Sequence, residues 1–125
     1  MKTLGIIGFG DFGRLAAEHL AARFDIGAFD AHVSAAEITA RGARALSFAE
    51  AAGSDVVMVA VPVQEMERVI KSIAPLVKPG ATVIDIASVK VLPSEWLLKY
   101  LPDSVHVVPT HPLFGPQSVA RDGLA

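Results

Sequence analysis

A glycine-rich segment near the start of the chain has the residue types and spacing of a phosphate-binding loop. Gly8, Gly10 and Gly13 form the pattern G-x-G-x-x-G around Asp11 and Phe12, after an apolar run and before a helical pattern. In dinucleotide sites the first glycine permits a tight turn, the second lets the backbone approach a pyrophosphate, and the third lets the helix pack closely. The free N–H groups and positive end of the helix then face the phosphates. Glycine-rich turns that bind nothing are also common, so the pattern alone does not establish a site.

An acidic residue at the end of the next apolar run supports the dinucleotide interpretation. Asp30 follows Gly13 by seventeen residues, and its carboxylate can accept hydrogen bonds from both hydroxyls of a ribose. The alternative is an ordinary turn residue. A carboxylate would repel the 2′-phosphate of NADP, and neither Arg nor Lys occurs in the next four residues, so NAD is favoured. Asp11 brings negative charge near the pyrophosphate, and we expect it to cap the helix and point away.

Two further segments lie at the carboxyl ends of predicted strands, where ligands of parallel sheets bind. Val61 and Pro62 end the most apolar run. Proline cannot continue a strand ladder, so the chain must turn there, either beside the nicotinamide ribose or simply to end the strand. Ser88 and Lys90 follow the next predicted strand in a loop that is either functional or ordinary surface.

A histidine framed by prolines is the candidate general base. His111 lies between Pro109 and Pro112, and a residue before proline is held in an extended conformation, which fixes the direction of the imidazole. At the carboxyl end of a strand, such an imidazole can take a proton while a nicotinamide takes a hydride. The other three histidines lack this frame, and no clustered ligand set predicts a metal site.

Alternating strand and helix patterns must position these residues. Strands are expected at Leu4–Gly8, Ile26–Phe29, Ala43–Leu46, Asp55–Val63, Thr82–Ile86 and His106–Val108. Helices are expected at Arg14–Phe24, Ser34–Gly42, Ser47–Ala52, Gln64–Ala74 and Pro93–Leu101. Ser34 and Ser47 are each followed three residues later by Glu, which predicts capping boxes. Strand-helix alternation with right-handed crossovers predicts an α/β fold with a doubly wound parallel sheet, the Rossmann fold.

The composition fits one globular domain over residues 1–125, which the glycine loop and Asp30 predict to be a dinucleotide-binding domain. Hydrophobic residues make up 52% of the chain and charged residues 19%, which argues against disorder. The net charge of −2 and the pI near 6.0 leave no basic surplus for a nucleic acid or an anionic membrane. The absence of cysteine excludes thiolate metal sites and suits a cytoplasmic protein. No apolar run is long enough to span a bilayer, and Asp11 follows too soon for a signal peptide.

The segments GFGDFG, VAVPV, DIASVK and THPLFGPQS, in this order and spacing, resemble the prephenate and arogenate dehydrogenases of tyrosine biosynthesis. The last two segments are specific to that family, whereas many dehydrogenases share the glycine loop. The resemblance implies that His111 accepts the proton of the ring hydroxyl and that Ser88 contacts that hydroxyl or the histidine. Lys90 and Gln117, in the same two segments, are further candidate substrate contacts. Hydride would pass from the hydroxyl-bearing ring carbon to the nicotinamide while CO₂ leaves and the ring aromatises.

Two departures from the family limit what the resemblance implies. Plant arogenate enzymes usually carry Ser-Arg at the positions of Phe29 and Asp30 and prefer NADP, so their cofactor is not carried over. The helical C-terminal domain of the family, which forms the dimer and contacts the substrate carboxylates, is absent from these 125 residues. We therefore expect this chain to be the cofactor domain, with little turnover by itself.

Three functions stay open on the sequence. The first is an NAD-dependent prephenate or arogenate dehydrogenase with a small-molecule substrate, a candidate homodimer without nucleic-acid or membrane partners. The second is a related dehydrogenase for a 3-hydroxy acid or an imine, which would share the glycine loop but would not explain DIASVK and THPLFGPQS together. The third is a dinucleotide-binding module without catalysis.

Overall fold

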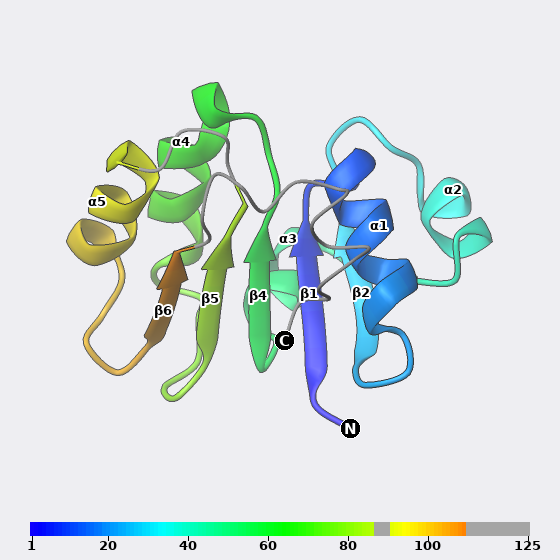
Figure 1. Cartoon of the computed structure of the whole chain (residues 1–125), viewed down its shortest axis with the longest axis horizontal. Coiled ribbons are helices and arrows are strands. Elements are labelled where there is room, and N and C mark those ends of the chain that lie inside the picture. The colour runs from blue at the N-terminus through cyan, green and yellow to red at the C-terminus, as the bar shows by residue number, and fades with distance from the viewer. Residues whose placement is uncertain (87–90, 110–125) are drawn as a thin grey trace.

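The computed structural model describes residues 1–86 and 91–109, which form one parallel sheet with helices on both faces (Figure 1). Six strands are found: β1 Thr3–Ile7, β2 Asp25–Phe29, β3 Arg44–Ala45, β4 Val56–Val59, β5 Thr82–Asp85 and β6 His106–Pro109. The helices of the described residues are α1 Asp11–Leu20, α2 Ala35–Ala40, α3 Phe48–Ala52, α4 Val63–Ile73 and α5 Val91–Tyr100.

The strand order confirms the doubly wound prediction. The order across the sheet is β3-β2-β1-β4-β5-β6, and every neighbouring pair is parallel. The chain winds outward from β1 to β3, returns to the centre, and winds outward again from β4 to β6. The direction of winding therefore reverses between β1 and β4, where ligands of such sheets bind, outside the carboxyl ends of the strands.

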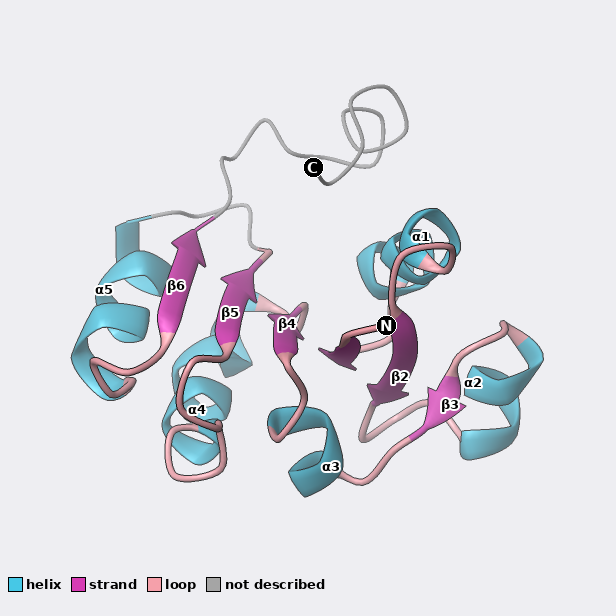
Figure 2. Cartoon of the chain, turned by 90° about the horizontal axis from the view of Figure 1, so that it is seen from below, coloured by secondary structure: helices cyan, strands magenta, loops and turns pink. Residues whose placement is uncertain are grey.

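Two apolar clusters hold the helices onto the sheet. One joins α3, α4 and α5 to one face, and the other joins α1 and α2 to the opposite face. Figure 2 shows α1 on one side of the row of strands and α3, α4 and α5 on the other. Met66, Ile70 and Ile73 of α4 are fully buried against the sheet, as their helical spacing predicts. The central strand is also buried, from Val57 to Val59, which confirms its apolar pattern as that of an internal strand.

Several predicted boundaries were wrong by a few residues. The first helix begins at Asp11 rather than Arg14, because the helical turn starts inside the glycine loop, where Arg14 N–H donates to Gly10 O at 3.0 Å. It ends at Leu20, whose carbonyl accepts the N–H of Phe24 in a terminal turn. The central strand is shorter than its apolar run, since the chain leaves the sheet after Val59.

The two predicted capping boxes form differently. Ser47 accepts the Glu50 N–H at 3.1 Å, and the Glu50 carboxylate accepts the Ser47 N–H at 2.8 Å, so this box is complete. Ser34 also caps α2 through the Glu37 N–H, at 3.2 Å. The Glu37 carboxylate instead lies 3.7 Å from the Arg14 guanidinium of α1, so it serves a contact between helices.

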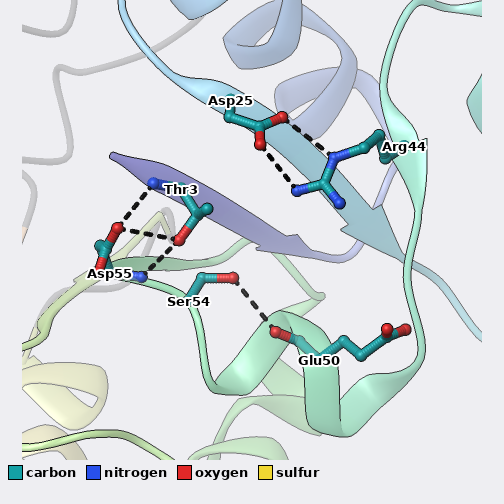
Figure 3. A network of polar contacts seen from close by, with 6 residues as sticks. All are labelled: Thr3, Asp25, Arg44, Glu50, Ser54 and Asp55. Atoms are coloured by element: carbon teal, nitrogen blue, oxygen red, sulfur yellow. Dashed lines mark hydrogen bonds and ion pairs between the residues drawn. The ribbon is translucent and has the colours of Figure 1, made fainter. Parts of the chain in front are cut away.

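Polar contacts connect neighbouring strands at their amino ends (Figure 3). Thr3 donates to Asp55 Oδ2 from its N–H at 2.9 Å and from its hydroxyl at 3.1 Å, and Asp55 N–H donates back to Thr3 Oγ1. The other oxygen of Asp55 pairs with Lys78 Nζ. Lys78, followed by the Thr3 hydrogen bonds, lowers the pKa of the Asp55 carboxyl from 3.8 to about 2. Arg44 binds Asp25 through two bonds of 3.0 and 3.1 Å.

Within residues 1–86 and 91–109, no helix has the length and apolar character needed to cross a membrane.

Candidate functional site

A cavity of about 770 Å³ opens at the carboxyl ends of β1, β2 and β4, where the winding reverses. Its lining comes from the last residues of β1 and β2, the glycine loop, the segments after β2 and β4 and one side of α4, with one residue from α3 and one that follows β5. The lining residues are Ile7, Gly8, Gly10, Asp11, Phe12, Phe29, Asp30, Ala31, His32, Val33, Phe48, Ala60, Val61, Pro62, Val63, Glu65, Arg68, Val69, Ser72 and Ile86.

The first glycine of the loop is required by the fold. Gly8 has a φ of +100°, a conformation that side chains rarely adopt, and a Cβ there would lie 2.7 Å from the backbone of Ala60. Its N–H donates to Phe29 O at 2.8 Å, which ties the loop to the end of β2. A tight turn at this glycine is therefore built into the junction of β1, β2 and β4.

The second and third glycines meet different surroundings. Gly13 is the third residue of α1, and a Cβ there would overlap the carbonyl oxygen of Gly8, so close packing of helix on strand requires this glycine. Gly10 has a φ of −83°, and a Cβ there would have no atom within 4 Å. Contacts within the described protein therefore do not explain Gly10, whereas a bound pyrophosphate beside the loop would.

Asp30 follows β2 and faces the cavity with its carboxylate held on both sides. Its Oδ2 accepts the Phe9 N–H at 2.6 Å and its Oδ1 accepts the His32 N–H at 2.7 Å. An ionised carboxylate has about four acceptor positions, so about two remain for the hydroxyls of a ribose. Asp30 therefore closes a local turn through His32 and also contacts the glycine loop through Phe9, while its contact with a ribose stays a prediction.

The expected cap by Asp11 was wrong. Gly10 is the N-cap of α1 and no side chain caps it, while Asp11 is the first residue of the helix and is exposed on the cavity lining. The helix starts one residue earlier than a cap by Asp11 requires, because Gly10 O already accepts the first helical hydrogen bond. A carboxylate in the first turn still interacts favourably with the helix dipole. Phe12, the next residue, lines the cavity and is half-buried.

The segment after β4 lines the opposite wall. Ala60 N–H still donates to Ile7 O at 2.8 Å, after which Val61 and Pro62 leave the sheet and Pro62 becomes the N-cap of α4. Both lie on the lining, as expected of a segment beside the ligand, and the missing N–H of proline costs nothing at this position. Contact of Val61 or Pro62 with a cofactor stays a prediction.

Part of the lining was missed on the sequence. Glu65, Arg68, Val69 and Ser72 face the cavity from one stripe of α4, and their spacing of three, one and three residues is a helical signal that could have been noticed. Phe48 comes from α3 and contacts Phe29 edge to face, with ring centroids 5.6 Å apart. No pattern in the sequence indicates this pair, because the route from β3 to α3 brings Phe48 to the site.

The predicted catalytic and substrate residues Ser88, Lys90, His111 and Gln117 lie outside the described residues. The described strand ends that precede their segments are neighbours, since Asp85 of β5 pairs with Pro109 of β6. Asp85 is fully buried, and Ile86 lies on the cavity lining. Among the residues that the structure describes, no group of three or more acidic or histidine side chains could hold a metal.

Comparison with known sequences identifies the family. Residues 22–124 match the family model described as prephenate dehydrogenase, nucleotide-binding domain. A probable arogenate/prephenate dehydrogenase of Methanocaldococcus jannaschii is 47% identical over 64 residues, which are 51% of this chain and 14% of that protein. A probable prephenate dehydrogenase [NADP(+)] of Schizosaccharomyces pombe is 31% identical over 121 residues, 91% of this chain and 28% of that protein. The chain thus spans less than a third of either relative.

Among solved structures, prephenate dehydrogenase from Aquifex aeolicus, in complex with hydroxyphenyl propionate and NAD+, has the same fold. The TM-score is 0.72 at 24% identity, over 92% of this chain and 43% of that chain. Fold, glycine loop and family match agree on a domain that binds a dinucleotide. The chain therefore belongs to the family of prephenate dehydrogenase nucleotide-binding domains.

Proposed function

We propose that this chain is the cofactor domain of an NAD-dependent enzyme that oxidatively decarboxylates prephenate or arogenate. The proposal rests on the family match over residues 22–124 together with the composition of the cavity. Gly10, beside which the space is open, and the carboxylate of Asp30 both line that cavity. The loop would hold the pyrophosphate with backbone N–H groups, and Asp30 would hold the adenosine ribose. The bound cofactor would supply a hydride acceptor.

The adenine end of the cofactor would lie between β2 and α4. Phe29, Phe48 and Val69 give that part of the cavity an apolar wall, and the two rings already meet edge to face. Both phenylalanines are half-buried, so part of each ring would be open to contact with a planar ligand. Burial of an adenine ring there would remove further aromatic surface from water.

We propose NAD in preference to NADP because the Asp30 carboxylate cannot easily turn away. Rotation would break the two bonds to Phe9 and His32, each a bond to a charged acceptor worth about 1.5–3 kcal/mol. A 2′-phosphate would therefore meet a fixed negative charge. Arg68 is the one Arg or Lys on the described lining, and its guanidinium is already paired with Glu65 at 2.9 Å. The fission yeast relative named for NADP(+) keeps that cofactor as the second candidate.

The proposed chemistry depends on residues known here from the sequence. His111 would take the proton of the substrate hydroxyl as the hydride leaves the same ring carbon, and Ser88 would orient that hydroxyl or the imidazole. The carboxylate on the ring would leave as CO₂, its electron pair completing the aromatic ring. The neighbouring ends of β5 and β6 support a common place for the two segments that carry Ser88 and His111.

Calorimetric titration of the 125-residue chain with NAD and NADP tests the cofactor part, and NAD should bind at least about tenfold more tightly. NADH formation with prephenate and with arogenate tests the chemistry in the chain joined to a helical domain of this family. There His111→Asn should lower turnover by about 10²–10⁴-fold with NAD affinity kept, and Ser88→Ala should cost less. Full activity of His111→Asn would remove the histidine from the mechanism. NAD binding without turnover on either substrate would favour the non-catalytic module.

We further propose a cytoplasmic enzyme with a small-molecule substrate, without nucleic-acid or membrane partners, that dimerises through the helical domain of the family. The slightly negative net charge of −2 supports the first part, because it offers nothing to a polyanion. Sedimentation of the chain with and without a helical domain would test the assembly.

A further inference from the structure

Asp30 joins the ribose side of the site directly to the glycine loop. The bond from His32 N–H to Oδ1 is local, since it closes a turn two residues long. The bond from Phe9 N–H to Oδ2 spans 21 residues of chain and connects the end of β2 to the middle of the loop. At 2.6 Å it has the short length of a charge-assisted hydrogen bond. The carboxylate is thus a structural part of the loop.

Phe9 is the residue through which the loop can be oriented. Its side chain is fully buried in the apolar cluster that contains α1, so packing of the ring holds the residue in position. The N–H groups of Gly8 and Phe9, successive in sequence, both point to the end of β2, one to Phe29 O and one to Asp30. These bonds set the peptide planes that lead into Gly10, where the space beside the backbone is open.

The Asp30 carboxylate lines the cavity and keeps acceptor positions that the backbone does not use. About two of its four acceptor positions are used by Phe9 and His32, and the other two suit a pair of hydroxyls. No rearrangement of Asp30 is needed to bind a ribose, since both backbone bonds can be kept. One side chain can therefore hold the loop and the ribose at the same time.

We propose that Asp30 is a positioning residue for the phosphate-binding loop in addition to its ribose contact, so that pyrophosphate affinity depends on its carboxylate even for a ligand without ribose hydroxyls. This inference rests on the proposed dinucleotide function. It differs from the ribose contact alone, which predicts that Asp30 matters only when hydroxyls are present.

The test compares ADP with 2′,3′-dideoxy-ADP, which keeps the pyrophosphate and lacks both hydroxyls. In Asp30→Ala, calorimetry should show dideoxy-ADP binding weakened about tenfold, and ADP binding weakened further. Nuclear magnetic resonance should show the Phe9 amide exchanging with solvent at least about tenfold faster than in the wild-type chain. Asp30→Asn, whose amide oxygen can still accept from Phe9, should restore dideoxy-ADP affinity and slow exchange while leaving ADP binding weakened.

The control is Asp25→Ala, at the opposite end of the same strand, where the carboxylate pairs with the exposed Arg44. It should change neither nucleotide affinity nor Phe9 exchange. Unchanged dideoxy-ADP affinity in Asp30→Ala, with or without faster Phe9 exchange, would overturn the positioning role while leaving the ribose contact intact. A wild-type chain that binds neither ADP nor NAD would overturn the proposed function itself, which distinguishes the two failures.

Discussion

Asp30 and Asp55 lie at opposite edges of the same parallel sheet, and each accepts one backbone N–H group from a distant part of the chain. Asp55 precedes β4 and accepts from Thr3 at the start of β1, with Lys78 on its second oxygen. Asp30 follows β2 and accepts from Phe9 and His32, with no described cation paired to it. The two carboxylates therefore serve similar backbone contacts in different electrostatic settings.

The two edges differ in how many hydrogen-bond acceptor positions their carboxylates keep for a ligand. At the amino edge, a lysine neutralises the carboxylate and lowers the pKa of Asp55 to about 2. At the carboxyl edge, the Asp30 carboxylate borders a cavity of about 770 Å³ and keeps acceptor positions for a ligand. At the amino edge, Thr3 and Lys78 engage both oxygens of Asp55. At the carboxyl edge, Asp30 binds two backbone N–H groups and keeps acceptor positions that a ligand could fill.

The largest expected effect is the loss of stability on replacement of Gly8, in the glycine loop of the carboxyl edge. Gly8→Ala should lower the free energy of unfolding by about 3 kcal/mol, because it combines a φ of +100° with a Cβ 2.7 Å from the Ala60 backbone. Urea denaturation measures the change. A loss below about 1 kcal/mol would mean that the loop relaxes, and the fold would then not require this glycine.

Replacement of Asp30 should change the preference between the two cofactors. Asp30→Ser removes the fixed charge that opposes a 2′-phosphate, so the ratio of the NADP and NAD dissociation constants should fall by about 10–100-fold. Calorimetric titration with both cofactors gives the ratio, and Asp25→Ser on the same strand is the matched control. An unchanged ratio would show that Asp30 does not determine the preference.

Much of the carboxyl edge could be predicted because its signals are local in the sequence. The spacing of Gly8, Gly10 and Gly13 and the position of Asp30 mark a strand, a turn and a helix in succession, and the structure brings these residues together. The alternation of patterns also predicted the sheet order. Helix ends were less predictable. The apolar spacing predicted a start at Arg14, whereas the hydrogen bond from Arg14 N–H to Gly10 O starts α1 within the loop.

Contacts between distant segments could not be predicted in the same way. The bond between Phe9 and Asp30 and the ring pair of Phe29 and Phe48 depend on how β1, β2 and α3 are arranged in space. The amino-edge contact of Asp55 with Thr3 has the same origin, since 52 residues separate the partners in the chain. Sequence patterns indicate which residues lie at an edge, whereas the partner of each follows from the packing of the whole sheet.

Gly10 should respond to substitution in the opposite way to Gly8. Serine is a strong N-cap and a side chain at Gly10 meets open space, so Gly10→Ser should keep or slightly raise the free energy of unfolding. The same side chain would occupy the approach of the pyrophosphate, and NAD affinity should fall about tenfold, or about 1.4 kcal/mol. Denaturation and calorimetry on one preparation measure both. Loss of stability with unchanged affinity would place the ligand elsewhere.

The smallest expected effect concerns Asp55 and appears in acid. The folded chain lowers the Asp55 pKa from 3.8 to about 2, chiefly through Lys78 and then through Thr3. A lowered pKa means that the unfolded chain binds the proton more readily. The carboxylate therefore stabilises the fold fully above pH 3.8, and this stabilisation is lost as the pH falls through about 2.

Asp55→Asn should accordingly have a lower urea midpoint than the wild-type chain near neutral pH, and the gap should close between pH 3.8 and about 2. The amide can still accept from Thr3 but cannot pair with Lys78, so the substitution isolates the charge. Asp25→Asn is the control, because it removes another paired carboxylate at the amino edge and leaves Asp55 and Lys78 unchanged. Urea midpoints measured across this range decide the matter. Parallel pH curves for Asp55→Asn and wild type would mean that the amino edge is held by its neutral hydrogen bonds alone, and that the charge of Asp55 adds nothing to it.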